Sequence, residues 1–75
     1  MITAKVFCNL KQEYGEGESR YATVGFGADY ADGRNKEWTQ ATPYLDLRMT
    51  VKGEVADRFE QGKAFTLQFV EEPTE

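Results

Sequence analysis

The residues best suited to hold a ligand gather in one short stretch of the chain. They are two cations, two polar side chains and an indole, namely Arg34, Asn35, Lys36, Thr42 and Trp38. An aromatic face can stack on a planar ring, and arginine or lysine can neutralise a phosphate. The stretch therefore predicts a binding site for a nucleotide-type ligand, and Tyr21, on a neighbouring segment, would add a second ring.

Trp38 has a second interpretation, which the sequence leaves open. It is the only tryptophan among 75 residues, and a domain this small needs its large apolar side chains for the core. The indole therefore either closes the core from its loop or contacts a ligand or partner.

Neither catalysis nor metal binding is expected. The chain has no histidine, which is the commonest general base and metal ligand. Its one cysteine, Cys8, permits no internal disulfide and no paired-cysteine metal site, and its place on an apolar row indicates a small buried side chain. Ser19 has no histidine to activate it, and the acidic residues are typical of solvated charges. We expect a protein that is not an enzyme and needs no cofactor.

Charge and hydropathy narrow the partners. Thirteen acidic and nine basic residues give a net charge of -4, which disfavours duplex DNA and anionic membranes. No apolar run approaches the roughly 20 residues of a membrane span or has the length of a signal peptide. The sequence therefore predicts a cytoplasmic protein that does not bind membranes.

Several segments alternate between apolar and polar residues with the period of two that is typical of strands. Their inward rows are Ile2, Ala4, Val6, Cys8 and Leu10; Ala22, Val24, Phe26, Ala28 and Tyr30; Leu45, Leu47, Met49 and Val51; and Phe65, Leu67 and Phe69. The predicted centre of the core comprises Val6, Leu47, Met49, Phe65 and Leu67.

The connections between these strands also carry signals. Glycines and acids in residues 14–19 predict a hairpin loop, and Asp32 with Gly33 predicts a turn. The connection over residues 31–43 is long for a compact domain, so we expect a short strand near residues 38–41, a functional role, or both. A short helix is predicted near residues 54–61, because Val55 and Phe59 are four residues apart and Gly62 follows.

The predicted fold is mainly β. We expect a small curved antiparallel sheet or a partly open barrel of four or five strands with one short helix, because closure buries one face and protects the edges. An open sheet with the helix across one face is the alternative. A single domain would cover residues 1–70, followed by an acidic tail over residues 71–75. Exposed edges and outward aromatic residues favour a homodimer.

The sequence Gly25-Phe26-Gly27 has two interpretations. Two glycines on an outward row predict a bend, a bulge or the close approach of another group. A glycine-aromatic-glycine element also resembles part of the binding strands of RNA-recognition and cold-shock domains.

A longer pattern resembles a family of small uncharacterised tailed-phage and prophage proteins. It comprises Asn35-Lys36-Glu37-Trp38, then Thr42-Pro43, the alternating segment 45–51, and Phe59-x-x-Gly62-Lys63-x-Phe65-x-x-x-Phe69, and so spans residues 35–69. Gln61 and Phe65 stand where the family has proline and tyrosine. The resemblance implies a phage protein acting in an infected bacterial host, and it implies no particular chemistry.

Three functions follow as hypotheses. The first is a binding protein that sequesters a nucleotide-type ligand, such as a host defence signal. The second is a protein inhibitor of a host defence or another host enzyme. The third is an accessory protein for single-stranded nucleic acid, which the negative charge disfavours.

Overall fold

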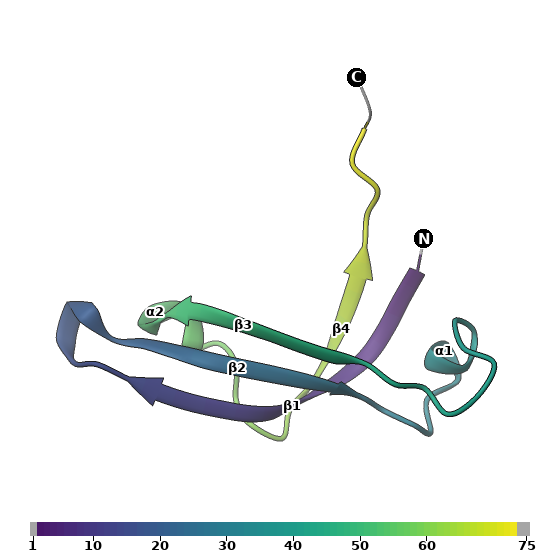
Figure 1. Cartoon of the computed structure of the whole chain (residues 1–75), viewed down its shortest axis with the longest axis horizontal. Helices are drawn as coiled ribbons and strands as arrows, with labels where there is room; N and C mark the ends of the chain where they lie inside the picture. The colour runs from purple at the N-terminus through teal and green to yellow at the C-terminus, as the bar shows by residue number, and fades with distance from the viewer. Residues whose placement is uncertain (1, 74–75) are drawn as a thin grey trace.

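The computed structural model describes residues 2–73, which form one four-stranded sheet with two short helices (Figure 1). The strands are β1 (Ile2–Tyr14), β2 (Tyr21–Ala28), β3 (Asp46–Lys52) and β4 (Ala64–Phe69). The α-helices are α1 (Gly33–Lys36) and α2 (Gly53–Ala56), and a 3₁₀ turn (Gly17–Ser19) lies in the β1–β2 hairpin. The fold is therefore mainly β, as the alternating rows predict.

β1 joins the two halves of the sheet. All strand pairs are antiparallel in the order β3-β2-β1-β4, so β3 and β4 are the edges. Residues 2–7 of β1 pair with β4, whereas its residues from Val6 onward pair with β2. In Figure 1 the start of β1 rises beside β4, and the rest runs beside β2. The sheet is curved and open, and it does not close into a barrel.

A bulge at Asn9 changes which side chains face the core. Cys8 pairs with Phe26, but the next pair is Leu10 with Gly25, so Asn9 is an extra residue in β1. One inserted residue reverses the alternation, and Leu10 therefore lies on the outer face with Gly25. The prediction that Leu10 continues the inward row of Cys8 is wrong for this reason.

The two outward glycines of β2 make room for this bulge. A Cβ atom at Gly27 would lie 2.8 Å from Asn9 Nδ2, and one at Gly25 would lie 3.1 Å from the Leu10 Cβ. Contacts this short leave little space for a side chain while Asn9 and Leu10 lie over β2. The close approach that the glycines predict is therefore made by β1 itself, and the bulge lies in β1 rather than in the strand that contains the glycines.

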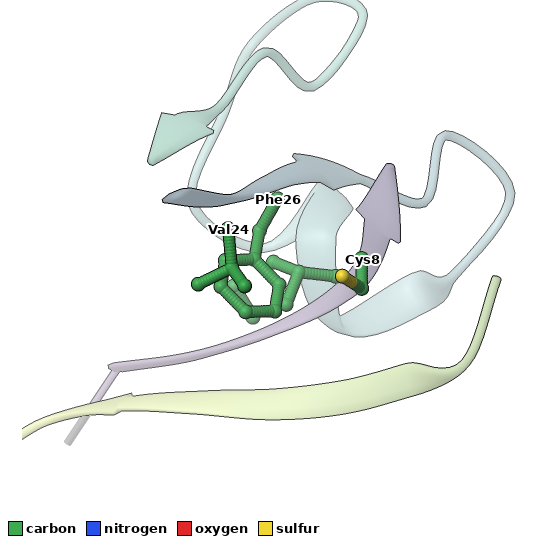
Figure 2. Packing of buried hydrophobic residues seen from close by; sticks show 5 residues of the cluster. Cys8, Val24 and Phe26 are labelled. Carbon is green, nitrogen blue, oxygen red and sulfur yellow. The ribbon is translucent and has the colours of Figure 1, made fainter. Parts of the chain in front are cut away.

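The core lies on the inner face of the two central strands. Ala4, Val6 and Cys8 of β1 pack with Val24 and Phe26 of β2, and each is at most 3% exposed. Figure 2 shows Cys8, Val24 and Phe26 packed together. Cys8 is thus the small buried side chain that its row predicts.

The predicted centre of the core is only partly right. Val6 is buried, but Leu47, Met49, Phe65 and Leu67 are half-buried and pack against the cluster from its sides. These four residues lie on the edge strands, where a neighbouring strand is present on one side only. The inner rows of β3 and β4 are therefore apolar but incompletely covered.

The helix predicted near residues 54–61 is shorter than expected, because α2 ends at Ala56. After it the hydrogen bonds tighten to three-residue spacing, as between the Phe59 N–H and the Ala56 carbonyl. This tighter turn brings Phe59 into edge-to-face contact with Phe26 and Phe65, with ring centroids 5.4 Å away in each case.

The connection between β2 and β3 contains a second helix where a short strand is predicted. α1 begins after Asp32, whose carboxylate accepts a hydrogen bond from the Arg34 N–H. Residues 38–41 form turns and bends, so the predicted strand is wrong. The chain also leaves β2 at Ala28, and Tyr30 is therefore 63% exposed rather than inward.

Beyond β4, residues 70–73 are exposed and form no regular element. Residues 74 and 75 of the predicted acidic tail lie outside the described residues. Within residues 2–73, no helix has the length and apolar character needed to cross a membrane.

Candidate functional site

Asn35 is fully buried, and its side chain fastens α1 to β1. Its Oδ1 accepts hydrogen bonds from the Lys5 N–H at 2.8 Å and from the Trp38 Nε1–H at 3.3 Å. Its Nδ2 donates to the carbonyl oxygens of Lys5 at 2.7 Å and Asp29 at 2.8 Å. Because both hydrogens and both oxygen lone pairs are used, no group is left for a ligand. The prediction that Asn35 contacts a ligand is therefore wrong, and the residue is structural.

Trp38 lies in the core. Its half-buried indole packs against the cluster on β1 and β2. The ring also lines an apolar hollow of about 300 Å³, together with Ile2, Ala4, Leu45 and Phe69. The hydrogen bond from its Nε1 to Asn35 fixes the orientation of the ring. Of the two interpretations, the structure favours core closure.

Arg34 is engaged within the protein. Its Nε donates to Asp32 Oδ1 at 3.1 Å, and its Nη1 donates to Thr66 Oγ1 at 3.2 Å. The side-chain hydrogen bond from Arg34, followed by the backbone hydrogen bond from its N–H, lowers the pKa of Asp32. Lys5 Nζ lies 3.4 Å from Asp29 Oδ2 and 3.9 Å from Asp32 Oδ2. The Arg34 guanidinium therefore neutralises an acid of its own loop.

Tyr21 is not brought together with the connection that follows β2. It is the first residue of β2 and Ala28 is the last, a separation of about 23 Å in an extended strand. The Tyr21 ring stacks instead on Tyr14, with centroids 5.2 Å apart and an angle of 24° between the planes.

Lys36 and Thr42 do meet, in a hollow on the connection between β2 and β3. This loop hollow has a volume of about 410 Å³ and is lined by Tyr30, Lys36, Thr39, Gln40, Ala41, Thr42 and Pro43. Lys36 is exposed and has no ion pair among the described residues. The loop hollow thus combines a cation, an exposed aromatic ring, an amide and two hydroxyl groups.

These groups can recognise a small anionic molecule. The ammonium of Lys36 can neutralise a phosphate or carboxylate, and the Tyr30 ring can stack on a planar group. The hydroxyls of Thr39 and Thr42 can donate to or accept from oxygen atoms of the ligand. The volume lies within the range of small-molecule sites, which is about 300–1,000 Å³.

Tyr30 is the residue of this hollow that the sequence prediction missed. Its spacing from Ala28 continues the inward row of β2, so the alternating pattern predicts that the Tyr30 side chain faces the core. The turn-forming residues between Asp29 and Gly33 are the signal that could have located it, because they end the strand before Tyr30.

The Gly25-Phe26-Gly27 element offers no exposed aromatic ring. Phe26 is 3% exposed and belongs to the core, and the flanking glycines lie beneath Asn9 and Leu10. An aromatic platform for unpaired bases is therefore not formed here.

Comparisons with known proteins add no relative to this description. No protein family, curated protein or solved structure matches the chain at a significant level.

Proposed function

We propose that this protein acts by binding rather than by catalysis, and that its ligand is a nucleotide-type small molecule held in the loop hollow. The observation that supports the proposal is that the exposed Lys36 and the exposed Tyr30 line the same hollow. A phosphate and a planar base are the parts of a nucleotide that these two groups recognise. Asn35 and Trp38 would hold the loop in place without contacting the ligand.

Charge limits the ligand further. Among residues 2–73, Lys36 is the only cation that lines the loop hollow, and the net charge of the chain is -4. A ligand with one or two negative charges should therefore bind better than a triphosphate, whose further charges would be repelled. Cyclic nucleotides carry one charge per phosphate. Together with the resemblance to phage proteins, this supports sequestration of a host defence signal in the bacterial cytoplasm.

Thermal shift and calorimetry with mono-, tri-, cyclic and cyclic dinucleotides test the proposal. Ligand binding to the folded state raises Tm, so we expect a rise with the less charged nucleotides. Lys36→Glu and Tyr30→Ala should each abolish the rise. Lys52→Glu makes the same charge change at the opposite end of β3 and should leave it intact. No rise with any nucleotide, or a rise that survives Lys36→Glu, would contradict the proposal.

A second candidate is inhibition of a host protein. The stacked rings of Tyr14 and Tyr21 are 42% and 44% exposed at one end of the sheet, and exposed tyrosine is enriched at protein interfaces. In this case Tm would be unchanged by nucleotides and would rise only with the protein partner, and Tyr21→Ala would weaken that complex.

A further inference from the structure

The chain exposes more surface than a compact protein of its size. Its accessible surface is 5777 Å², whereas a compact 8.5 kDa monomer exposes about 4,650 Å². Its radius of gyration is 14.4 Å, compared with about 11 Å for a compact chain of this length. The exposed segment 70–73 contributes to both differences. The rest comes from the shape of the sheet, which makes the molecule only 15 Å deep along its shortest axis.

The uncovered surface includes the inner rows of the two edge strands. Leu47 and Met49 of β3 and Phe65 and Leu67 of β4 line an apolar groove of about 200 Å³ above Val6 and Phe26. The hollow beside Trp38 continues this apolar surface toward Ile2 and Phe69, which pair across β1 and β4. These two side chains are 55% and 56% exposed. We call this surface the inner strip: Ile2, Leu45, Leu47, Met49, Leu67 and Phe69.

The composition of the inner strip restricts its occupant. None of its six residues is charged or polar, so a complementary partner must present an apolar surface of similar length. Among the described residues the ion pairs lie outside the inner strip, as with Arg20 and Asp57 beside α2. A second copy supplies a matching apolar strip, and a twofold axis would leave the polar outer faces of both copies in water.

The area also agrees with a second copy. The accessible surface of the whole chain exceeds that of a compact monomer by about 1,100 Å², and the exposed segment 70–73 accounts for a part of this excess. Each partner in a standard protein interface buries about 800 Å², so the part of the excess that belongs to the sheet is of the same order. A sheet buries its apolar face against another layer, and within residues 2–73 Trp38 and Phe59 cover this face only in part.

We propose that two copies of the chain pack face to face through the inner strip and form a symmetric β-sandwich. The loop hollow shares no lining residue with the inner strip. The dimer therefore does not depend on the proposed ligand, and either proposal can fail without the other.

Sedimentation and light scattering of the full chain test the dimer. We expect twice the chain mass of 8.5 kDa at high micromolar concentration. Because association stabilises only the folded state, a hundredfold increase in protein concentration should raise Tm by about 5–10 °C.

Two matched variants locate the interface. Met49→Lys and Thr50→Lys add the same charge at adjacent positions of β3, but Met49 is on the half-buried inner row and Thr50 is on the exposed outer row. Met49→Lys should weaken dimerisation at least a hundredfold, and Thr50→Lys should leave it unchanged. Phe69→Lys gives a second test at an exposed position, where a lone chain should fold as before.

The proposal is overturned by a mass of 8.5 kDa at all concentrations with a constant Tm. It is also overturned if Phe69→Lys and Met49→Lys both fold and retain the wild-type dimer affinity. The first result would mean that the inner strip awaits a different protein or stays open. The second would mean that the dimer uses another face, such as the unpaired edges of β3 and β4.

Discussion

At the scale of single residues, Asn35 decides where the connection after β2 lies. Its amide pairs with the Lys5 peptide through one accepted and one donated hydrogen bond, just beyond the end of β2. It also holds the Trp38 indole and the Asp29 carbonyl. The residue types alone predict a ligand site here. Amides, cations and indoles, however, serve both for ligand binding and for loop anchoring. Only the burial of Asn35 and its hydrogen bonds with Lys5, which lies 30 positions away in the chain, distinguish the two uses.

We predict that Asn35→Asp lowers the free energy of unfolding by about 3 kcal/mol or more at neutral pH. A carboxylate cannot donate to the carbonyl oxygens of Lys5 and Asp29. The Asp29 carbonyl would lose this partner, the Lys5 carbonyl would keep only its bond from the Asp29 N–H, and both oxygens would lie beside a negative charge. Urea denaturation measures the change. Lys36→Ala, in the same helix but exposed, should stay within about 0.5 kcal/mol of the wild type. An equally small effect of Asn35→Asp would show that α1 is not fastened through this amide.

At the scale of elements, the sequence predicts the strands better than their boundaries and partners. The alternating rows locate all four strands, and the rows face the core except at Leu10 and Tyr30. The bulge at Asn9 and the double pairing of β1 are not readable from the pattern, because both depend on contacts between distant segments. The same holds for α2, which ends at Ala56 because Phe59 turns into the core. The glycines at positions 25 and 27 indicated a close approach but not the segment that makes it.

α2 is fastened to the start of β2 by Arg20. Its two terminal nitrogens each donate to one Asp57 carboxylate oxygen at 2.9 Å. The Gly53 N–H donates to the Arg20 carbonyl, and the guanidinium lies so close that a Cβ at Gly53 would be 2.7 Å from its Nε. The hydrogen bond from Arg20 is the largest influence lowering the pKa of Asp57; the charges of Arg20 and Lys11 act in the same direction, and burial opposes them.

This lowered pKa predicts a loss of stability in acid. The folded state favours the ionised carboxylate, so the stabilising contribution is complete above the ordinary aspartate pKa of about 4. It is lost as the pH falls through the lower pKa of the folded state. Asp57→Asn should therefore be less stable than the wild type at pH 7, and the difference should shrink below about pH 4. Glu18→Gln, in the exposed 3₁₀ turn, controls for the loss of one charge. A difference that is constant from pH 7 to pH 3 would argue against the ion pair.

At the scale of the whole molecule, the reactivity of the Cys8 thiol measures how readily β1 separates from β2 and β4. It is 1% exposed and pairs with Phe26 of β2. Its N–H donates to the Lys63 carbonyl, and its carbonyl accepts from the Gly62 N–H, at the turn that leads into β4. The thiol therefore lies where the pairing of β1 with both neighbours meets. A reagent can reach it only if the central strand separates from at least one of them.

We predict that a thiol reagent labels native Cys8 at least about a thousandfold more slowly than the urea-unfolded chain, because labelling requires an opening close to global unfolding. Each chain has one cysteine, so the reaction has a single phase with one equivalent of reagent. In a dimer the opening is coupled to dissociation, and the labelling rate should then fall as the protein concentration rises. Rapid labelling of a protein that keeps its β-sheet circular dichroism would contradict this, because it would mean that the bulge at Asn9 opens locally while the two halves of the sheet stay paired.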